Sequence, residues 1–139
     1  MIVIQTCFRV LLVLWAGSLW SLAAWVAPTL FYAQADRHLA GLLAARLFDI
    51  ETYVGLGVAL LAALLPGRRK FKWGFVAAVL LALNQWALRP VMAAAHNRGA
   101  VAGLSFGAWH GVSAVLYILA CLAMVVLIWQ GEYSPAQDG

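Results

Sequence analysis

The 26 residues from position 10 to position 35 contain no charged side chain. As an α-helix this stretch would be about 39 Å long at ~1.5 Å per residue, which exceeds the ~30 Å hydrocarbon core of a bilayer. The apolar part of a cleaved signal peptide is shorter, roughly 7–15 residues. We therefore expect a membrane-spanning helix here, and we expect Pro28 to bend it or end it.

The composition of the whole chain supports the same conclusion. Hydrophobic residues make up 65% of the 139 residues and charged residues only 10%, whereas a soluble domain is roughly half apolar and a quarter charged. The length suits one domain. We predict an all-α integral membrane four-helix bundle followed by a short polar tail at 132–139. The helices are expected at about 5–34, 39–65, 73–95 and 103–130.

The charge-free parts of the second and third helices are too short to cross a bilayer. Their charge-free runs, 52–67 and 73–88, contain 16 residues each, or about 24 Å of helix. To cross ~30 Å of hydrocarbon, the second helix must include Asp49 and Glu51 and extend towards Arg46, and the third must continue through Arg89. A bend is expected at Pro90, because proline leaves a backbone carbonyl without its donor.

The basic residues predict the orientation. Four of the nine lie between the second and third helices, at Arg68, Arg69, Lys70 and Lys72. Positive residues favour the cytoplasmic side, so both termini are expected in the cytoplasm and the polar turns at 36–38 and 96–99 outside. Arginine outnumbers lysine, which suggests a bacterial gene, and we expect the protein in the bacterial inner membrane. Nucleic-acid binding is not expected, because no extended basic surface remains outside the helices.

Polar residues on three helices are expected at similar depth in the outer half of the bundle. Arg46, Asp49 and Tyr53 share one helix face, and Phe106, His110, Ser113, Tyr117 and Cys121 share another. Ionisable residues inside a membrane usually face the bundle interior or a wet cavity. The candidate ligand-binding residues are Arg46, Asp49, Glu51, Gln85, Arg89, His110, Ser113 and Tyr117. We expect Arg89 and His110 to face inwards, close to each other or to Asp49.

Each of these residues also has a structural interpretation. Arg46 and Asp49 can form an ion pair within their helix, Arg89 can reach the headgroups, and Ser113 can bond to its own helix. Glu51 lies on a different face from Asp49. It shares that face with Gly55, where a neighbouring helix can approach closely. The tryptophans Trp15, Trp20 and Trp86 are expected in the core.

Small residues recur along the first helix at Gly17, Ser21, Ala24 and Pro28. Their spacing of four, three and four is typical of a close-packing helix surface.

Motifs for common chemistries are absent from the sequence. It contains no glycine-rich phosphate loop, no cysteine pair at zinc spacing and no nucleophile elbow. We therefore predict no enzymatic activity, no metal ligands and no cofactor. Haem held by two histidines would need a partner for His110, and the nearest is His96 in the turn.

Three segments together resemble the transmembrane-protein-205-like family, which is also catalogued as a domain of unknown function in bacteria. They are Ala27-Pro28-Thr29-Leu30-Phe31 with the following stretch 46–55, Leu88-Arg89-Pro90, and Phe106 with Trp109-His110-Gly111-Val112-Ser113. The resemblance covers nearly the whole chain, and its most specific part is the His-Gly-x-Ser pattern. It implies a four-helical membrane protein without an established activity or cofactor. Animal members are associated with platinum-drug resistance and secretory trafficking, and they keep the basic-Leu-Phe pattern but not both acids, Asp49 and Glu51.

Three functional hypotheses follow. The first is binding or translocation of a small solute or metal species at the outer polar site. The second is an accessory or scaffold subunit that contacts a membrane protein or a second copy within the bilayer. A haem or redox membrane protein is the third.

Overall fold

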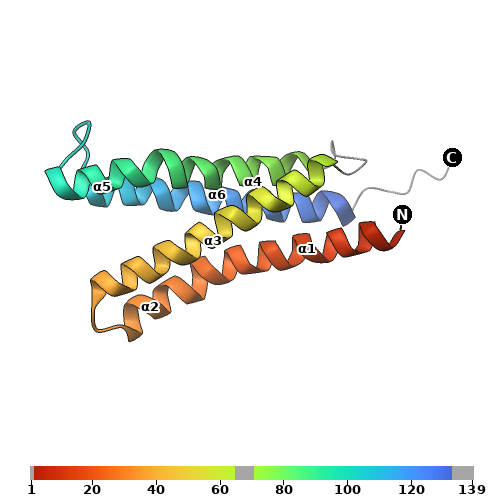
Figure 1. Ribbon diagram of the computed structural model, residues 1–139, viewed down its shortest axis with the longest axis horizontal. Helices are drawn as coiled ribbons and strands as arrows, with labels where there is room; N and C mark the ends of the chain where they lie inside the picture. The colour runs from red at the N-terminus through yellow and green to blue at the C-terminus, as the bar shows by residue number, and fades with distance from the viewer. Residues whose placement is uncertain (1, 65–70, 133–139) are drawn as a thin grey trace.

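The computed structural model describes residues 2–64 and 71–132, which form four long helices (Figure 1). Two of the four are divided by a short π-helical segment. All four are long and apolar enough to cross a membrane, which confirms the predicted all-α membrane bundle. The helix limits differ from the expected ones by no more than three residues. In chain order the elements are α1 (Ile2–Ser21), η1 (Leu22–Val26), α2 (Ala27–Ala33), α3 (Arg37–Leu64), α4 (Lys72–Leu83), η3 (Asn84–Leu88), α5 (Arg89–Arg98) and α6 (Phe106–Glu132).

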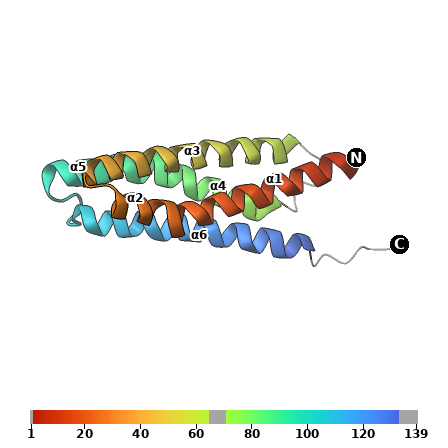
Figure 2. The ribbon, with the colours of Figure 1, turned by 90° about the horizontal axis from the view of Figure 1, so that it is seen from below.

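The helices run antiparallel and define two ends of the bundle (Figures 1 and 2). We call the end where α1 begins and α6 ends the proximal end. The distal end is where α2 connects to α3 and α5 connects to α6. The two described ends of the chain therefore lie together, as four spans require, while the cytoplasmic placement of this end stays a prediction. Of the basic cluster, Arg68, Arg69 and Lys70 lie outside the described residues, as does the tail after Glu132.

The distal helix ends are formed by local hydrogen bonds. The Asp36 carboxylate accepts hydrogen bonds from the backbone N–H groups of His38 and Leu39, at 2.8 and 3.2 Å, which makes Asp36 the N-cap of α3. Gly99 follows α5 with a φ of 85°, a conformation that glycine adopts at little cost. Asp36 thus fixes where the first distal turn ends, and Gly99 fixes where the second begins.

A π-helical segment precedes each membrane proline by the same offset. Segment η1 ends two residues before Pro28, and η3 ends two residues before Pro90. In both, the backbone N–H just before the proline bonds five residues back, from Ala27 to Leu22 and from Arg89 to Asn84. Proline lacks an N–H and its ring collides with the carbonyl four residues earlier. The wider turn accommodates that collision, so both helices continue past their proline.

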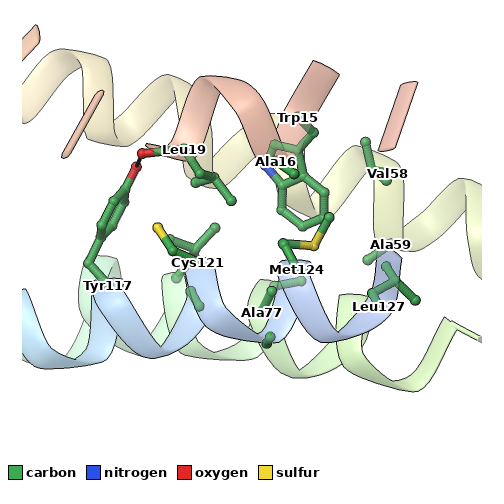
Figure 3. Packing of buried hydrophobic residues seen from close by; sticks show 14 of the residues in the cluster. Trp15, Ala16, Leu19, Val58, Ala59, Ala77, Tyr117, Cys121, Met124 and Leu127 are labelled. Carbon is green, nitrogen blue, oxygen red and sulfur yellow. Dashed lines mark hydrogen bonds between the residues drawn. The ribbon is translucent and has the colours of Figure 1, made fainter. Parts of the chain in front are cut away.

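The buried core lies towards the proximal end, where α1, α3, α4 and α6 meet (Figure 3). Trp15 is its largest fully buried side chain, with 2% of its surface exposed. Trp20 and Trp86 are exposed, so their predicted place in the core is wrong. Both lie on apolar faces that lipid can cover.

Gly55 makes room for Trp15. A Cβ atom added to Gly55 would lie 2.5 Å from a ring carbon of Trp15, far inside van der Waals contact. The absence of a side chain therefore lets the indole of α1 rest on the α3 backbone. The predicted close helix approach at Gly55 is confirmed.

At the distal end the bundle opens. Figure 1 shows the α2–α3 hairpin diverging from the α5–α6 hairpin towards the left of the view. In this region α2 packs on α3 and α5 packs on α6. The two hairpins therefore separate on the distal side of the core.

Candidate functional site

Polar contacts join the four spans in a closed ring. Each span contacts the next through at least one pair of polar groups, and the fourth contacts the first. The pairs are Ser18 with Glu51, Asp49 with Arg89, Asn84 with Ser113, and Tyr117 with the backbone carbonyl of Leu19.

The contact between α3 and α5 is an ion pair in which an Arg89 guanidinium nitrogen donates to the Asp49 carboxylate. The Asp49 side chain is 14% exposed and the Arg89 side chain 42%. Arg89 was expected close to His110 or Asp49, and the contact with Asp49 is confirmed. The alternative pairing of Asp49 with Arg46 is wrong, because Asp49 bonds across to the neighbouring span.

Arg46 lies one helical turn to the distal side of Asp49, on the same face of α3. The Tyr53 ring, one turn to the proximal side, makes an edge contact with Trp86 of η3, with ring centroids 6.4 Å apart. The face therefore points towards η3 and α5. Arg46 itself is exposed and has no ion-pair partner among the described residues. We call Arg46, Asp49 and Arg89 the arginine face.

Glu51 points to the other side of α3, towards α1 and α6. Its carboxyl oxygen lies 3.1 Å from Ser18 Oγ, and Tyr117 and Cys121 of α6 are the ionisable groups near it. Glu51 therefore does not share a site with Asp49, as the helix geometry predicted. We call Ser18, Glu51 and Tyr117 the inner cluster.

The Asn84 amide and Ser113 form two hydrogen bonds between η3 and α6. Asn84 Nδ2 donates to the Ser113 carbonyl at 3.0 Å, and Ser113 Oγ donates to Asn84 Oδ1 at 2.6 Å. Ser113 thus bonds to the neighbouring span rather than to its own helix. Gln85, half-buried beside this pair, makes no side-chain hydrogen bond to the described residues.

Tyr117 is buried, with 5% of its surface exposed. Its hydroxyl donates to the Leu19 carbonyl at 3.0 Å (Figure 3), and its ring packs edge-on against Phe48, with centroids 4.8 Å apart. Its position ties α6 to both α1 and α3. No open surface is left for a ligand at the phenol.

His110 lies apart from the other candidates. Its ring stacks on Phe106 at a centroid distance of 6.0 Å, and Phe106 in turn contacts His96 at 5.4 Å. His110 is exposed and lies only four residues after the start of α6. The expectation that it faces inwards beside Arg89 is wrong, because the His-Phe-His stack holds it at the distal edge.

The described residues contain no group of three or more His, Cys, Asp or Glu side chains placed to hold a metal ion. A shallow depression at the distal end is lined by Thr29, Leu30, Ala33 and Gln34. It lies on α2, away from the arginine face. Most candidate polar residues of the described spans thus lie in paired contacts between helices, while Arg46 is exposed beside the Asp49–Arg89 pair.

Ser18 and Asn84 complete two of the four contacts, but sequence reasoning did not select them. Each is a polar residue in a largely apolar span, and each lies near its middle. Ser18 is 15 residues from both Val3 and Ala33. Asn84 is 12 residues after Lys72 and 14 before Arg98. Their central depth was the available signal, because an unpaired polar group there would be costly.

Comparison with known proteins assigns the chain to a family. The chain matches the model of a domain of unknown function, DUF4149, over residues 10–101. The match includes most of the first span and all of the second and third, and it ends before α6, so His110 and Ser113 lie outside it. No curated protein and no solved structure matches the chain. Because the matched region is about two thirds of the chain, the protein belongs to the DUF4149 family.

Proposed function

We propose that this membrane protein binds a small anionic solute at the arginine face. The proposal rests on an excess of positive charge within the membrane-spanning helices, because the arginine face contains two arginines and only one carboxylate. Asp49 neutralises part of this charge through Arg89, while Arg46 is exposed and unpaired within the described chain. Charges placed inside a membrane are costly and usually serve a pathway or a ligand.

The chemistry of arginine suits an anion with oxygen acceptors. A guanidinium carries five N–H donors in a fixed fork that matches carboxylate or phosphate groups. Arg89 contacts Asp49 through one nitrogen and stays 42% exposed. The remaining donors of Arg89, together with Arg46, can therefore hold a second anion. The two hairpins diverge towards the distal end (Figure 1), and Arg46 lies one helical turn to the distal side of Asp49.

The role proposed is binding or translocation, without catalysis. We place the protein in a bacterial inner membrane with the distal end in the periplasm, on the strength of its basic residues.

Replacing Arg46 with glutamine is expected to weaken anion binding. Inorganic phosphate is the probe, titrated by calorimetry into protein purified in an uncharged detergent at low ionic strength. Losing one charge-assisted contact should raise Kd by about tenfold, or ~1.4 kcal/mol. Folding should be unaffected, because Arg46 makes no ion pair among the described residues.

Arg37→Gln is the matched control. Arg37 is exposed at the first turn of the same helix, so its replacement removes the same charge away from the arginine face. Kd should then stay at the wild-type value. An equal loss in both variants would mean that phosphate responds only to overall charge, and the proposed site would be abandoned.

A scaffold role is the second candidate, favoured by the small residues of the first span. Gly17, Ser21, Ala24 and Pro28 are all exposed, so this stripe is open to contact from outside the bundle. Small residues let a second helix approach closely within lipid. The occupant we propose is a second copy of this chain.

Gly17→Leu tests this contact. No atom lies within 4 Å of a Cβ at Gly17, so leucine leaves the monomer intact while it blocks a close helix approach. We expect the dimer fraction to fall in cross-linking of native membranes. Gly57→Leu is the control, because Gly57 on α3 is equally open. A wild-type protein that never cross-links would remove the scaffold proposal.

A further inference from the structure

Glu51 lies at the middle of the membrane span. It is 14 residues after Arg37 and 13 before Leu64, or about 20 Å from either end of α3. Its neighbour Ser18 lies at the midpoint of the first span. The carboxyl group therefore belongs to the central turns of its span, where a bilayer would be driest.

No cation neutralises Glu51 within the described residues, where the one ion pair joins Arg89 to Asp49. The ionisable groups that face it belong to α6 and are Tyr117 and Cys121. Neither carries a positive charge. The ionisable residues of α1 and α4, namely Cys7, Arg9 and Lys72, lie near the proximal end. An ionised Glu51 would thus be an isolated charge in a medium of low dielectric constant, which is strongly unfavourable.

The two contacts of Ser18 are best satisfied when Glu51 carries a proton. Ser18 Oγ lies 2.8 Å from the Trp15 carbonyl and 3.1 Å from Glu51 Oε2. A serine hydroxyl has one proton but can accept as well. The Trp15 carbonyl can only accept, and one serine proton cannot fully satisfy two acceptors. A protonated Glu51 lets Ser18 satisfy both contacts, because Ser18 then donates to the Trp15 carbonyl and accepts from the carboxyl group.

We infer that Glu51 is a proton-binding site, a neutral carboxylic acid that donates its proton to Ser18 at the centre of the membrane. This inference is independent of anion binding, since Glu51 and the arginine face lie on different sides of α3. Asp49 differs from Glu51 in this respect. It lies at a similar position along α3, but its charge is balanced by Arg89. The bundle thus holds two acidic residues in opposite protonation states, two positions apart.

Release of the proton would create an uncompensated negative charge unless water or a cation reached Glu51 at the same time. The bound proton is therefore exchangeable only when the inner cluster opens.

Infrared spectroscopy tests this assignment directly. Protein in dodecyl maltoside, a detergent without carbonyl groups, is measured at neutral pH in water and in heavy water. We expect the carbonyl stretch of a carboxylic acid, shifted by deuteration, in the wild type. The band should be missing in Glu51→Gln, which keeps the shape and neutrality of the protonated acid. Asp49→Asn should retain the acid band and lose carboxylate bands.

The opposite pattern would overturn the inference. Either carboxylate bands would disappear in Glu51→Gln, or the wild type itself would show no acid band. The second result needs no variant, so poor folding of Glu51→Gln does not obscure the answer.

An apolar carbodiimide gives a second measurement in native membranes. The acid transfers its proton to a carbodiimide nitrogen, the carboxylate oxygen adds to the central carbon, and rearrangement gives a stable N-acylurea with the full mass of the reagent. Peptide mass analysis should find the adduct on Glu51. An adduct on Asp49 in place of Glu51 would contradict the inference.

Discussion

Asp49→Ala is expected to destabilise the bundle by about 3 kcal/mol, more than Asp49→Ala/Arg89→Ala does. Breaking a buried ion pair by removing one partner costs ~3–5 kcal/mol, because the other charge stays buried, whereas removing both is much milder. We expect the lower end of this range, since the Arg89 side chain is 42% exposed. Reversible unfolding in mixed micelles, followed by circular dichroism, measures both losses.

The interpretation depends on the coupling between the two residues. A double-mutant cycle with Arg89→Ala isolates their interaction from the packing of each side chain. Arg46→Ala/Asp49→Ala provides the comparison, because Arg46 does not pair with Asp49 and its removal should not relieve the defect. Equal losses in Asp49→Ala and Asp49→Ala/Arg89→Ala would show that the ion pair contributes nothing.

Gly55→Ala is also expected to lower the stability of the bundle substantially. The new methyl group would lie 2.5 Å from a ring carbon of Trp15, while the same change at Gly57 meets nothing within 4 Å. Both replacements gain the higher helix propensity of alanine, ~1 kcal/mol. The difference between the two variants therefore isolates the collision, which should cost about 1–3 kcal/mol as overpacking. Thermal unfolding in detergent gives the comparison.

Trp15→Phe should rescue Gly55→Ala. Phenylalanine lacks the second ring, which supplies the atoms closest to the added methyl group. The double variant should thus be more stable than Gly55→Ala with Trp15 intact. Identical stability of Gly55→Ala and Gly57→Ala would mean that α1 does not rest on α3 at this position.

The number of spans could be predicted because lipid sets their length. The second helix needed residues as far out as Arg46 to cross the bilayer, and α3 contains them. The place of Glu51, opposite Asp49, followed from helix periodicity alone. Both results depend on distances along one helix, which the sequence contains directly.

Contacts between helices were harder to predict. Asp49 had a suitable partner on its own helix, Arg46, and another on the third span, Arg89. Both arginines could be placed at similar depth, and choosing between them requires the rotation of each helix about its axis. The predicted burial of Trp20 and Trp86 was wrong for a related reason. In a membrane protein an aromatic side chain can be covered by lipid as readily as by protein.

His110 was misplaced because its depth was counted from an earlier helix start. The fourth helix was expected from about residue 103, but α6 begins at Phe106. The intervening residues form a turn in which Val101 and Leu104 exchange backbone hydrogen bonds. Three residues correspond to about 4.5 Å of helix, enough to move His110 from the polar level to the edge.

The two π segments next to the prolines make two of the four spans easier to bend than the other two. Each hairpin combines one unbroken rod, α3 or α6, with one jointed rod whose outer piece is α2 or α5. Bending is concentrated where a helix departs from regular geometry, so the outer pieces can tilt as levers while the proximal core keeps its packing. Arg89 is the first residue beyond one joint. Its bond to Asp49 therefore holds the base of α5 against α3, so that α5 can tilt about this contact without breaking it.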